Sequence, residues 1–230
     1  MSFIQPNTKR KEDATVNYYS VASKNLLLIF TRNPELGKCK TRLAATVGDT
    51  AALAIYRFLL DHTVAITLNL EAAKQVWYSE EIWEDDIWDA SFYDKKLQKG
   101  DNLGIRMANA FQEGFESGFE RIIVIGSDMY DLDQNDLHNA FLHLSDNDFV
   151  IGPAEDGGYY LLGMKTFKPE LFQNKDWGKE TVLKDSLADL RNEKHHILGE
   201  RNDIDFYEDI KDIDAFKPFL KHIKNDTEAT

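Results

Sequence analysis

One short apolar run, followed at once by a polar turn, constrains the fold of this chain more than any other feature. Arg121-Ile122-Ile123-Val124-Ile125 is apolar at consecutive rather than alternate positions, which is typical of a strand buried on both faces of a parallel sheet. Gly126-Ser127-Asp128 follows it directly. Ligands bind at the carboxyl ends of strands in open α/β sheets, so Asp128 is a candidate ligand for a divalent cation that carries a phosphate-bearing substrate. An aspartate that merely caps the next turn would explain the same pattern.

The remainder of the chain alternates strand-like and helix-like segments. Strand-like runs occupy residues 26–30, 75–78, 148–152, 159–163 and 196–198, and helical spacing occupies residues 51–70, 103–119, 133–144 and 179–190. Further helical segments are expected from Phe206 onward. This order predicts an α/β fold with a doubly wound, mostly parallel sheet. No hinge rich in Pro, Gly or Ser divides the chain, so we expect a single domain over residues 25–222, with a flexible extension at 1–24 and a tail at 223–230.

Composition limits the classes of function. The 230 residues carry a formal net charge of −13, which argues against a nucleic-acid partner because such a partner requires a basic face. Cys39 is the only cysteine, the N-terminus has no apolar signal segment, and no apolar run is long enough to cross a membrane. We therefore expect a cytoplasmic protein with no membrane span, and the sequence leaves its oligomeric state open. An anionic substrate has to meet a local basic cluster or a metal ion.

Such a basic cluster follows the first strand. Residues 31–43 form a connection rich in cations within a chain that is otherwise acidic. In a doubly wound fold this connection faces the ligand crevice, where Arg and Lys clamp diphosphates, although a solvent-exposed basic loop would look the same. The segment lacks the Gly-Lys-Ser/Thr ending of a P-loop. The candidate phosphate-binding residues are Arg32, Lys38, Lys40, Arg42 and, at the start of the 103–119 helix, Arg106.

Two acidic segments complete the set of candidate residues. Glu155-Asp156-Gly157-Gly158-Tyr159 places carboxylates beside paired glycines, so a ligand can approach the backbone next to a general base; a hairpin turn is the alternative interpretation. Asp203 and Asp205 point to the same side of an extended segment and would bind a hard cation if a third carboxylate joined them. They also suit a helix cap followed by an acidic first turn.

Taken together, these segments resemble the DUF2064 family of bacterial proteins. That family is related to the GT-A glycosyltransferases and to small nucleotidyltransferases such as the phospholactate guanylyltransferases, and some of its members are assigned to arsenosugar biosynthesis as glycosyltransferases. The resemblance extends from about Leu26 to Ile213. The motifs that carry it are Pro34…Gly37…Lys40-Thr41-Arg42-Leu43, Leu103-Gly104…Arg106-Met107, Gly126-Ser127-Asp128, Gly152-Pro153-Ala154…Asp156-Gly157-Gly158-Tyr159, Trp177-Gly178 and Asp203-Ile204-Asp205…Glu208-Asp209.

The resemblance implies a GT-A fold, a Rossmann-like αβα sandwich that binds a nucleotide at the ends of its first strands. It also implies Mg²⁺ or Mn²⁺ held by Asp128 together with Asp203, Asp205 or both. The acidic pair Glu155-Asp156 stands where an inverting enzyme keeps its base, and the family pattern favours Asp156 for that role. Gly157, Gly158 and Tyr159 would then form a substrate loop.

Three functional hypotheses follow from the resemblance and the candidate residues. The leading one is a metal-dependent glycosyltransferase that moves a sugar from a nucleotide-diphosphate donor to a small acceptor. The second is a nucleotidyltransferase that joins an NTP to a phosphorylated small molecule and releases pyrophosphate. The third is a non-catalytic nucleotide-binding module, which Met129-Tyr130 favours because the family usually has Cys-Pro or a similar pair there. The sequence identifies neither the base, the sugar, the acceptor nor the stereochemical course.

Overall fold

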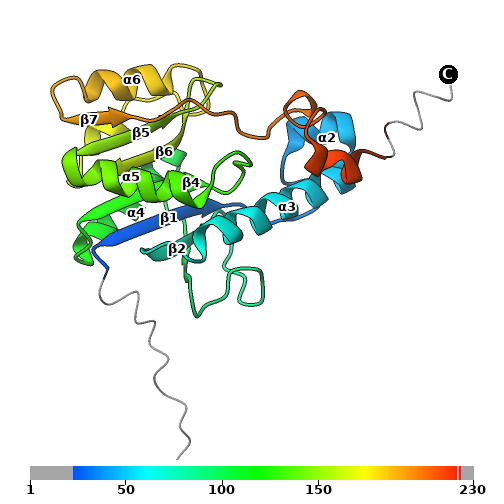
Figure 1. Ribbon diagram of the computed structural model, residues 1–230, viewed down its shortest axis with the longest axis horizontal. Coiled ribbons are helices and arrows are strands. Elements are labelled where there is room, and N and C mark those ends of the chain that lie inside the picture. Colours follow the sequence, from blue (N-terminus) through cyan, green and yellow to red (C-terminus); the bar gives the residue numbers. More distant parts are fainter. Residues whose placement is uncertain (1–22, 222, 224–230) are drawn as a thin grey trace, which may run out of the picture.

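A seven-stranded sheet forms the centre of the molecule (Figure 1). The computed structural model describes residues 23–221 and residue 223. The strands are β1 (Asn25–Thr31), β2 (Ala73–Tyr78), β3 (Asp94–Leu97), β4 (Arg121–Gly126), β5 (Phe149–Pro153), β6 (Tyr159–Met164) and β7 (His195–Ile197), in the order β3-β2-β1-β4-β6-β5-β7. Only β6 runs antiparallel to its two neighbours, β4 and β5. The predicted α/β fold with a mostly parallel sheet is therefore confirmed.

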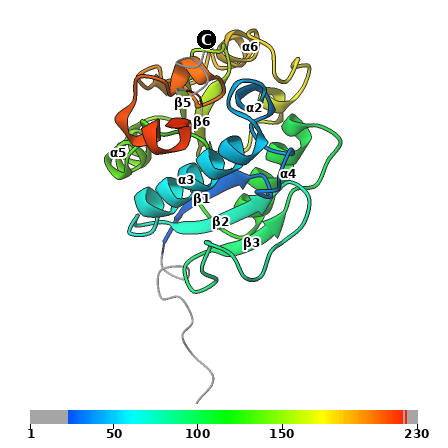
Figure 2. The ribbon, with the colours of Figure 1, turned by 90° about the vertical axis from the view of Figure 1, so that its right-hand side faces the viewer.

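Helices cover both faces of this sheet. They are α2 (Thr41–Val47), α3 (Asp49–Thr67), α4 (Leu103–Glu116), α5 (Gln134–Asp146) and α6 (Val182–Asp189), with 3₁₀ turns η1 (Pro169–Phe172), η2 (Tyr207–Asp209) and η3 (Asp214–Leu220). Neighbouring residues of β1 point to opposite faces: Leu27 and Ile29 join the cluster under α3 and α5, whereas Leu26 and Leu28 join the cluster under α4. Figure 2 shows α3 and α5 on one side of the sheet and α4 on the other. The result is the expected αβα sandwich.

A third apolar cluster joins segments from the beginning and the end of the described chain. Leu43 of α2 and Ile55 of α3 pack in it with Ile204, Ile210 and Phe216. Figure 1 shows these segments at one end of the molecule, toward which β1 runs. We call this cluster the C-terminal lobe. It lies at the carboxyl end of β1, where the connection from β1 enters α2.

The strand order places a topological switch point between β1 and β4. From β1 the chain adds β2 and then β3 on one side, and it returns to place β4 on the other side. Open α/β sheets bind ligands in the crevice outside the strand ends at such a point. The ends in question are Thr31 of β1 and Gly126 of β4, so the predicted basic connection and Asp128 both border this crevice.

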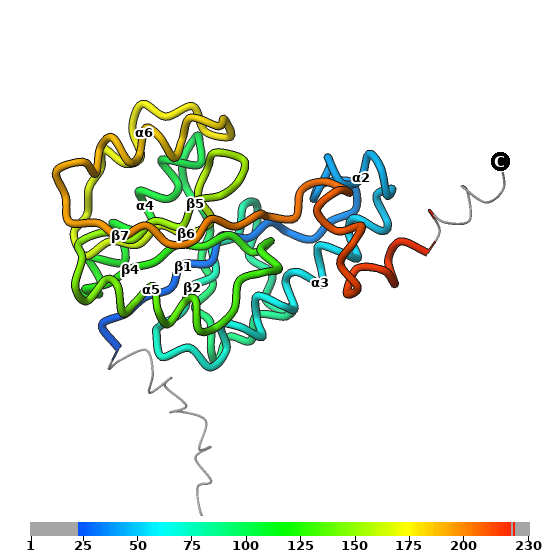
Figure 3. Tube along the Cα trace, turned by 45° about the horizontal axis from the view of Figure 1, so that its top comes forward, coloured from blue at the N-terminus to red at the C-terminus, as the bar shows by residue number. Residues whose placement is uncertain are grey.

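One extended segment then crosses the strand ends from β7 to the C-terminal lobe (Figure 3). Its backbone is fixed by successive hydrogen bonds: Leu198 N donates to Ile151 O (2.8 Å), and Arg201 N donates to Pro153 O (3.1 Å). Ile204 N then donates to Asp128 O (3.3 Å). These bonds bring the 203–205 segment beside the end of β4, although the two are far apart in sequence.

Some elements differ from the sequence predictions. Residues 41–43, the end of the predicted basic connection, are the first residues of α2, and residues 94–97 form the edge strand β3, which was not predicted. From residue 206, where helical segments are predicted, residues 207–209 and 214–220 form the 3₁₀ turns η2 and η3 rather than α-helices. The predicted extension and tail lie almost entirely outside the described residues. No helix in the described part of the chain is long and apolar enough to cross a membrane.

Candidate active site

The side chain of Tyr56, from α3, holds the ends of β1 and β4 together. Its phenolic oxygen accepts a hydrogen bond from Arg32 N (2.9 Å) and lies 3.3 Å from Thr31 Oγ1 and 3.2 Å from Ser127 Oγ. Burial raises the pKa of this phenol, so its proton remains available for donation. The turn that carries Asp128 is thus fixed relative to the basic connection.

Lys40 lies in the middle of a carboxylate cluster. Its Nζ donates to Asp128 Oδ2 (2.8 Å) and lies 4.0 Å from Asp205 Oδ1, and only 6% of its side chain is exposed. Burial lowers the pKa of the Lys40 ammonium, but the attraction of Asp128, Asp203 and Asp205 outweighs it, so the net shift is upward. Lys40 therefore remains charged and offsets part of the negative charge of the cluster.

Asp203 and Asp205 face different neighbours. Burial, followed by repulsion from the Asp128 carboxylate, raises the pKa of Asp203 to about 6, against the opposing effect of Lys40. Asp205 instead accepts a hydrogen bond at 2.6 Å from Arg42, whose guanidinium lies over the Phe206 ring. Both aspartates belong to the carboxylate cluster around Lys40, and Asp205 is in addition paired with Arg42 of the basic connection.

All five predicted phosphate-binding residues line one cavity of about 760 Å³, which we call the basic cavity. Within it, Arg106 is oriented by a hydrogen bond from its Nε to Gly100 O (2.9 Å). Lys38 is more than half exposed and pairs with Glu35 and Glu80. The wall of the basic cavity includes Arg32, Lys38, Lys40, Arg42, Arg106, Gln98, Asp128 and Asp205.

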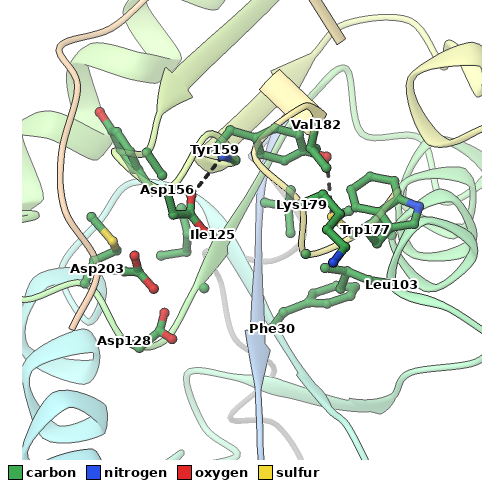
Figure 4. A pocket seen from close by; sticks show the side chains of 18 residues that line it. Phe30, Leu103, Ile125, Asp128, Asp156, Tyr159, Trp177, Lys179, Val182 and Asp203 are labelled. Atoms are coloured by element: carbon green, nitrogen blue, oxygen red, sulfur yellow. Dashed lines mark hydrogen bonds between the residues drawn. The ribbon is translucent and has the colours of Figure 1, made fainter. Parts of the chain in front are cut away.

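A second cavity, of about 230 Å³, adjoins the first; we call it the apolar cavity. Both cavities are lined by Phe30, Leu103, Gly126 and Asp128, so Asp128 lies on their common wall. Figure 4 shows the carboxylates of Asp128, Asp156 and Asp203 on one side of the apolar cavity, with Phe30, Leu103 and Trp177 on the other. Gly158 and Tyr159 also line it.

The loop between β5 and β6 is both a hairpin connection and part of the wall of the apolar cavity. Ala154 N donates to Gly158 O (3.0 Å), and Asp156 Oδ1 accepts a hydrogen bond from Gly158 N (2.8 Å). Gly157 has φ +83°, and a Cβ at this position would overlap the backbone of Glu180. Glu155, by contrast, lines neither cavity. The catalytic roles predicted for Asp156 and Glu155 remain predictions.

The comparison with protein families settles what this chain belongs to. The model of DUF2064, described as an uncharacterized protein conserved in bacteria, matches residues 54–179. The chain belongs to the DUF2064 family. No curated protein matches its sequence.

Solved structures identify the fold of this DUF2064 protein. A proposed nucleotide-diphospho-sugar transferase from Desulfovibrio desulfuricans G20 is 28% identical, with a TM-score of 0.76 over 88% of this chain and 96% of that chain. A cytidylyltransferase from Leptospira borgpetersenii serovar Hardjo-bovis (strain JB197) is 16% identical, with a TM-score of 0.53 over 90% of this chain and 96% of that chain. CMP:2-keto-3-deoxy-manno-octonic acid synthetase, solved with CTP, is 11% identical, with a TM-score of 0.50 over 85% of this chain and 99% of that chain. The DUF2064 protein therefore has the α/β fold of nucleotide-diphospho-sugar transferases, as its motifs implied.

The carboxylates suit a metal ion that arrives with its substrate better than a metal held by the protein alone. Within the described residues, no three His, Cys, Asp or Glu side chains are grouped so that they could hold a metal ion. Asp128 and Asp203 line the same cavity, and Asp205 is engaged by Arg42. Mg²⁺ is commonly bound by one or two carboxylates together with substrate phosphates. Asp128 and Asp203 fit that arrangement, and the predicted metal and its ligands remain a prediction.

The residue pair that departs from the family pattern packs against the core, and Met129 also lines the apolar cavity. Met129 is buried in the core, and the Tyr130 ring lies 5.8 Å from that of Phe58 and 4.9 Å from that of Phe216. Tyr130 therefore connects the end of β4 to the C-terminal lobe. Sequence analysis missed Tyr56 and Phe30 as parts of the site, because both belong to apolar patterns that also predict core positions.

Proposed function

We propose that this DUF2064 protein is a metal-dependent glycosyltransferase that transfers a sugar from a nucleotide-diphosphate donor to a small acceptor. One observation carries the proposal: Asp128 lies on the common wall of a cationic cavity and a second cavity bordered by Asp156 and Asp203. A transfer between two substrates requires two adjoining binding sites that meet where the bonds change. The likeness to the Desulfovibrio desulfuricans protein supports the same class of donor.

The basic cavity would bind the donor. Lys40, Arg42 and Arg106 line it and would offset the charge of the diphosphate. Asp128 and Asp203 would hold Mg²⁺ or Mn²⁺, which when bound supplies further neutralisation of the leaving group. Lys40 has a second role, since it reduces the repulsion within the carboxylate cluster before any ligand is present.

Asp156 would act as the general base. Its carboxylate borders the apolar cavity and is oriented by the backbone N–H of Gly158. It would take the proton from the acceptor hydroxyl as that oxygen attacks the sugar, a contribution of roughly 10²–10⁴-fold. Glu155 lines neither cavity, so the geometry favours Asp156 over its neighbour.

A nucleotidyltransferase is the second candidate, since a cytidylyltransferase and a synthetase solved with CTP share the fold. The same basic cavity would then bind an NTP, and the product would be pyrophosphate rather than an NDP. The third candidate is a non-catalytic nucleotide-binding module, which the departure from the family pattern at Met129-Tyr130 favours. Tight nucleotide binding without turnover of any donor would support it.

The test is a product assay with one variant and one matched control. Purified protein is incubated with Mn²⁺ or Mg²⁺ and panels of NDP-sugars and NTPs, with small alcohols added as acceptors, and NDP and pyrophosphate are measured. We expect NDP release from one sugar donor, its loss in Asp128→Asn with an unchanged circular dichroism spectrum, and its retention in Asp61→Asn. Asp61 is exposed and lines neither cavity.

Each other outcome changes the assignment. Pyrophosphate release from one NTP would move the protein to the nucleotidyltransferases. Full activity of Asp128→Asn would remove this carboxylate from the mechanism and, with it, the argument from the common wall.

A further inference from the structure

The apolar cavity has its three carboxylates on one side and the Lys179 side chain on the opposite side, beside Trp177 and Leu103 (Figure 4). The hydroxyl of Tyr159 donates to Met107 Sδ (3.8 Å) and that of Tyr160 donates to Gly199 O (3.1 Å), so the proton of each phenol already has an acceptor within the protein. The charged side chains that line the cavity are the carboxylates of Asp128, Asp156 and Asp203, together with Lys179. The rest of the wall is mainly apolar and includes Phe30, Met107, Trp177 and Val182.

Trp177 gives this cavity a fixed aromatic wall. A Cβ at Gly104 would overlap the indole, so the ring lies directly against the first turn of α4. The indole also meets the Tyr159 ring edge to face, with 6.4 Å between centroids and an interplanar angle of 86°. Two segments distant in sequence, 103–107 and 177–182, thus form a shaped site rather than an incidental gap between side chains.

The shape and charge of this site discriminate between classes of acceptor. A buried sugar needs a polar partner for nearly every hydroxyl, because a buried hydroxyl without a hydrogen bond is costly, and most of the side chains that line this cavity are apolar. A phosphorylated compound would bring its charge close to three carboxylates, and Lys179 is the single cationic side chain that lines the cavity within the described part of the chain. A compact molecule with an apolar body and one hydroxyl meets neither difficulty.

We propose that the apolar cavity binds the acceptor and that this acceptor is a small alcohol or phenol with an apolar body. The inference rests on the proposed glycosyl transfer. The cavity has a volume of about 230 Å³, and the side chains that line it are mainly apolar. The apolar body contacts Trp177 and Val182, and the hydroxyl faces Asp156.

The proposed transfer exchanges one bond at the anomeric carbon for another. A bond forms between the acceptor oxygen and the anomeric carbon of the sugar, and the bond from that carbon to the diphosphate oxygen breaks. The electron pair of the broken bond leaves with the nucleoside diphosphate. The hydroxyl proton passes to the carboxylate of Asp156.

The experiment separates acceptor binding from turnover. Benzyl alcohol, cyclohexanol, glucose and glycerol 3-phosphate are titrated by ligand-observed NMR into the wild type, Trp177→Ala, Val182→Trp and the control Trp83→Ala. Trp83 lies elsewhere, with its indole N–H bonded to Glu81, and lines neither cavity. Affinity for UDP and GDP, which would occupy the basic cavity, is measured in parallel as a check on folding.

We expect the two apolar alcohols to bind the wild type and Trp83→Ala equally. Their affinity should fall about tenfold or more in Trp177→Ala, because an aromatic contact is lost, and become undetectable in Val182→Trp, because the cavity is filled. Nucleotide affinity should stay unchanged in all four proteins. A cavity variant that no longer binds nucleotide is taken to be misfolded. The alcohol affinity of the other cavity variant then tests the proposal.

The outcomes distinguish the acceptor class from the proposed function. Apolar binding that depends on Trp177 and Val182 supports the acceptor class, and an absence of NDP release would then count against glycosyl transfer alone. Preferential binding of glucose or glycerol 3-phosphate would overturn the acceptor class even if NDP release confirms a glycosyltransferase. Equal binding of the apolar alcohols to the wild type and both cavity variants would overturn it as well.

Discussion

Asp203 makes the stability of the folded protein depend on pH. Burial and the nearby Asp128 carboxylate raise its pKa from 3.8 to about 6, so the folded state binds this proton more tightly than the unfolded chain does. Ionised Asp203 therefore destabilises the fold. Its cost is absent below about pH 3.8, grows as the pH rises to about 6, and is complete above that value.

We therefore predict that Asp203→Asn stabilises the metal-free protein above pH 6. The gain should be at most about 3 kcal/mol and should shrink as the pH falls toward 4, where the wild type is protonated as well. Urea unfolding in EDTA, followed from pH 4 to pH 8, measures it. Asp61→Asn, an exposed control, should show no such trend. A gain that does not change with pH would contradict the proposed origin of the effect.

Residue types were easier to predict than residue pairs. The sequence identified Lys40 and Asp128 as candidates from composition and from position after two strands, and both line the crevice. It did not predict the ion pair between them, because Lys40 reaches the cluster from a left-handed backbone conformation (φ 49°) that is uncommon for residues with a Cβ. A pairing of this kind depends on the tertiary path of the loop.

At the scale of elements, the hairpin between β5 and β6 depends on Gly157. Its φ of +83° costs another residue about 1–2 kcal/mol, and a Cβ would also overlap the Glu180 backbone. We predict that Gly157→Ala lowers stability by more than that cost and displaces Asp156, so that turnover falls even in protein that remains folded. Gly199→Ala is the matched control, since a Cβ there has no atom within 4 Å.

Thermal unfolding and the NDP-release assay measure the two effects on the same samples. Wild-type stability in Gly157→Ala would show that the loop can shift away from Glu180. The positioning role given to Gly157 would then be wrong.

Long apolar elements were predicted well, and short polar ones were not. The buried strands β1 and β4 and the helices α3 and α4 have strong apolar patterns, which sequence alone reveals. α2 has seven residues and no side-chain cap, and β3 is an edge strand with the sequence DKKL. Neither segment has a periodic apolar pattern from which it could be predicted. Both elements are stabilised by tertiary contacts rather than by local propensity.

At the scale of the whole molecule, the C-terminal lobe connects stability to the site. Phe216 is fully buried in it and contacts Phe58 and Tyr130, while the same cluster contains Leu43 of α2 and Ile204. Leu43 directly follows Arg42 in the sequence, and Ile204 directly follows Asp203, so both neighbours of these apolar residues belong to the site. Because the basic cavity takes part of its wall from α2 and from the 203–205 segment, loosening the lobe should disturb that cavity as well.

We therefore predict that Phe216→Ala lowers the unfolding free energy by about 3–5 kcal/mol and also weakens nucleotide binding by the folded fraction. Phe141→Ala is the matched control: Phe141 is also buried, but it belongs to α5 and packs against the sheet in another cluster. It should lower stability comparably and leave nucleotide affinity within about twofold, since the loss then lies outside the lobe. Urea unfolding and calorimetric titration with UDP or GDP, at a temperature where both variants are folded, give the two quantities. Equal nucleotide affinity in the two variants would show that the lobe stabilises the fold without supporting the site.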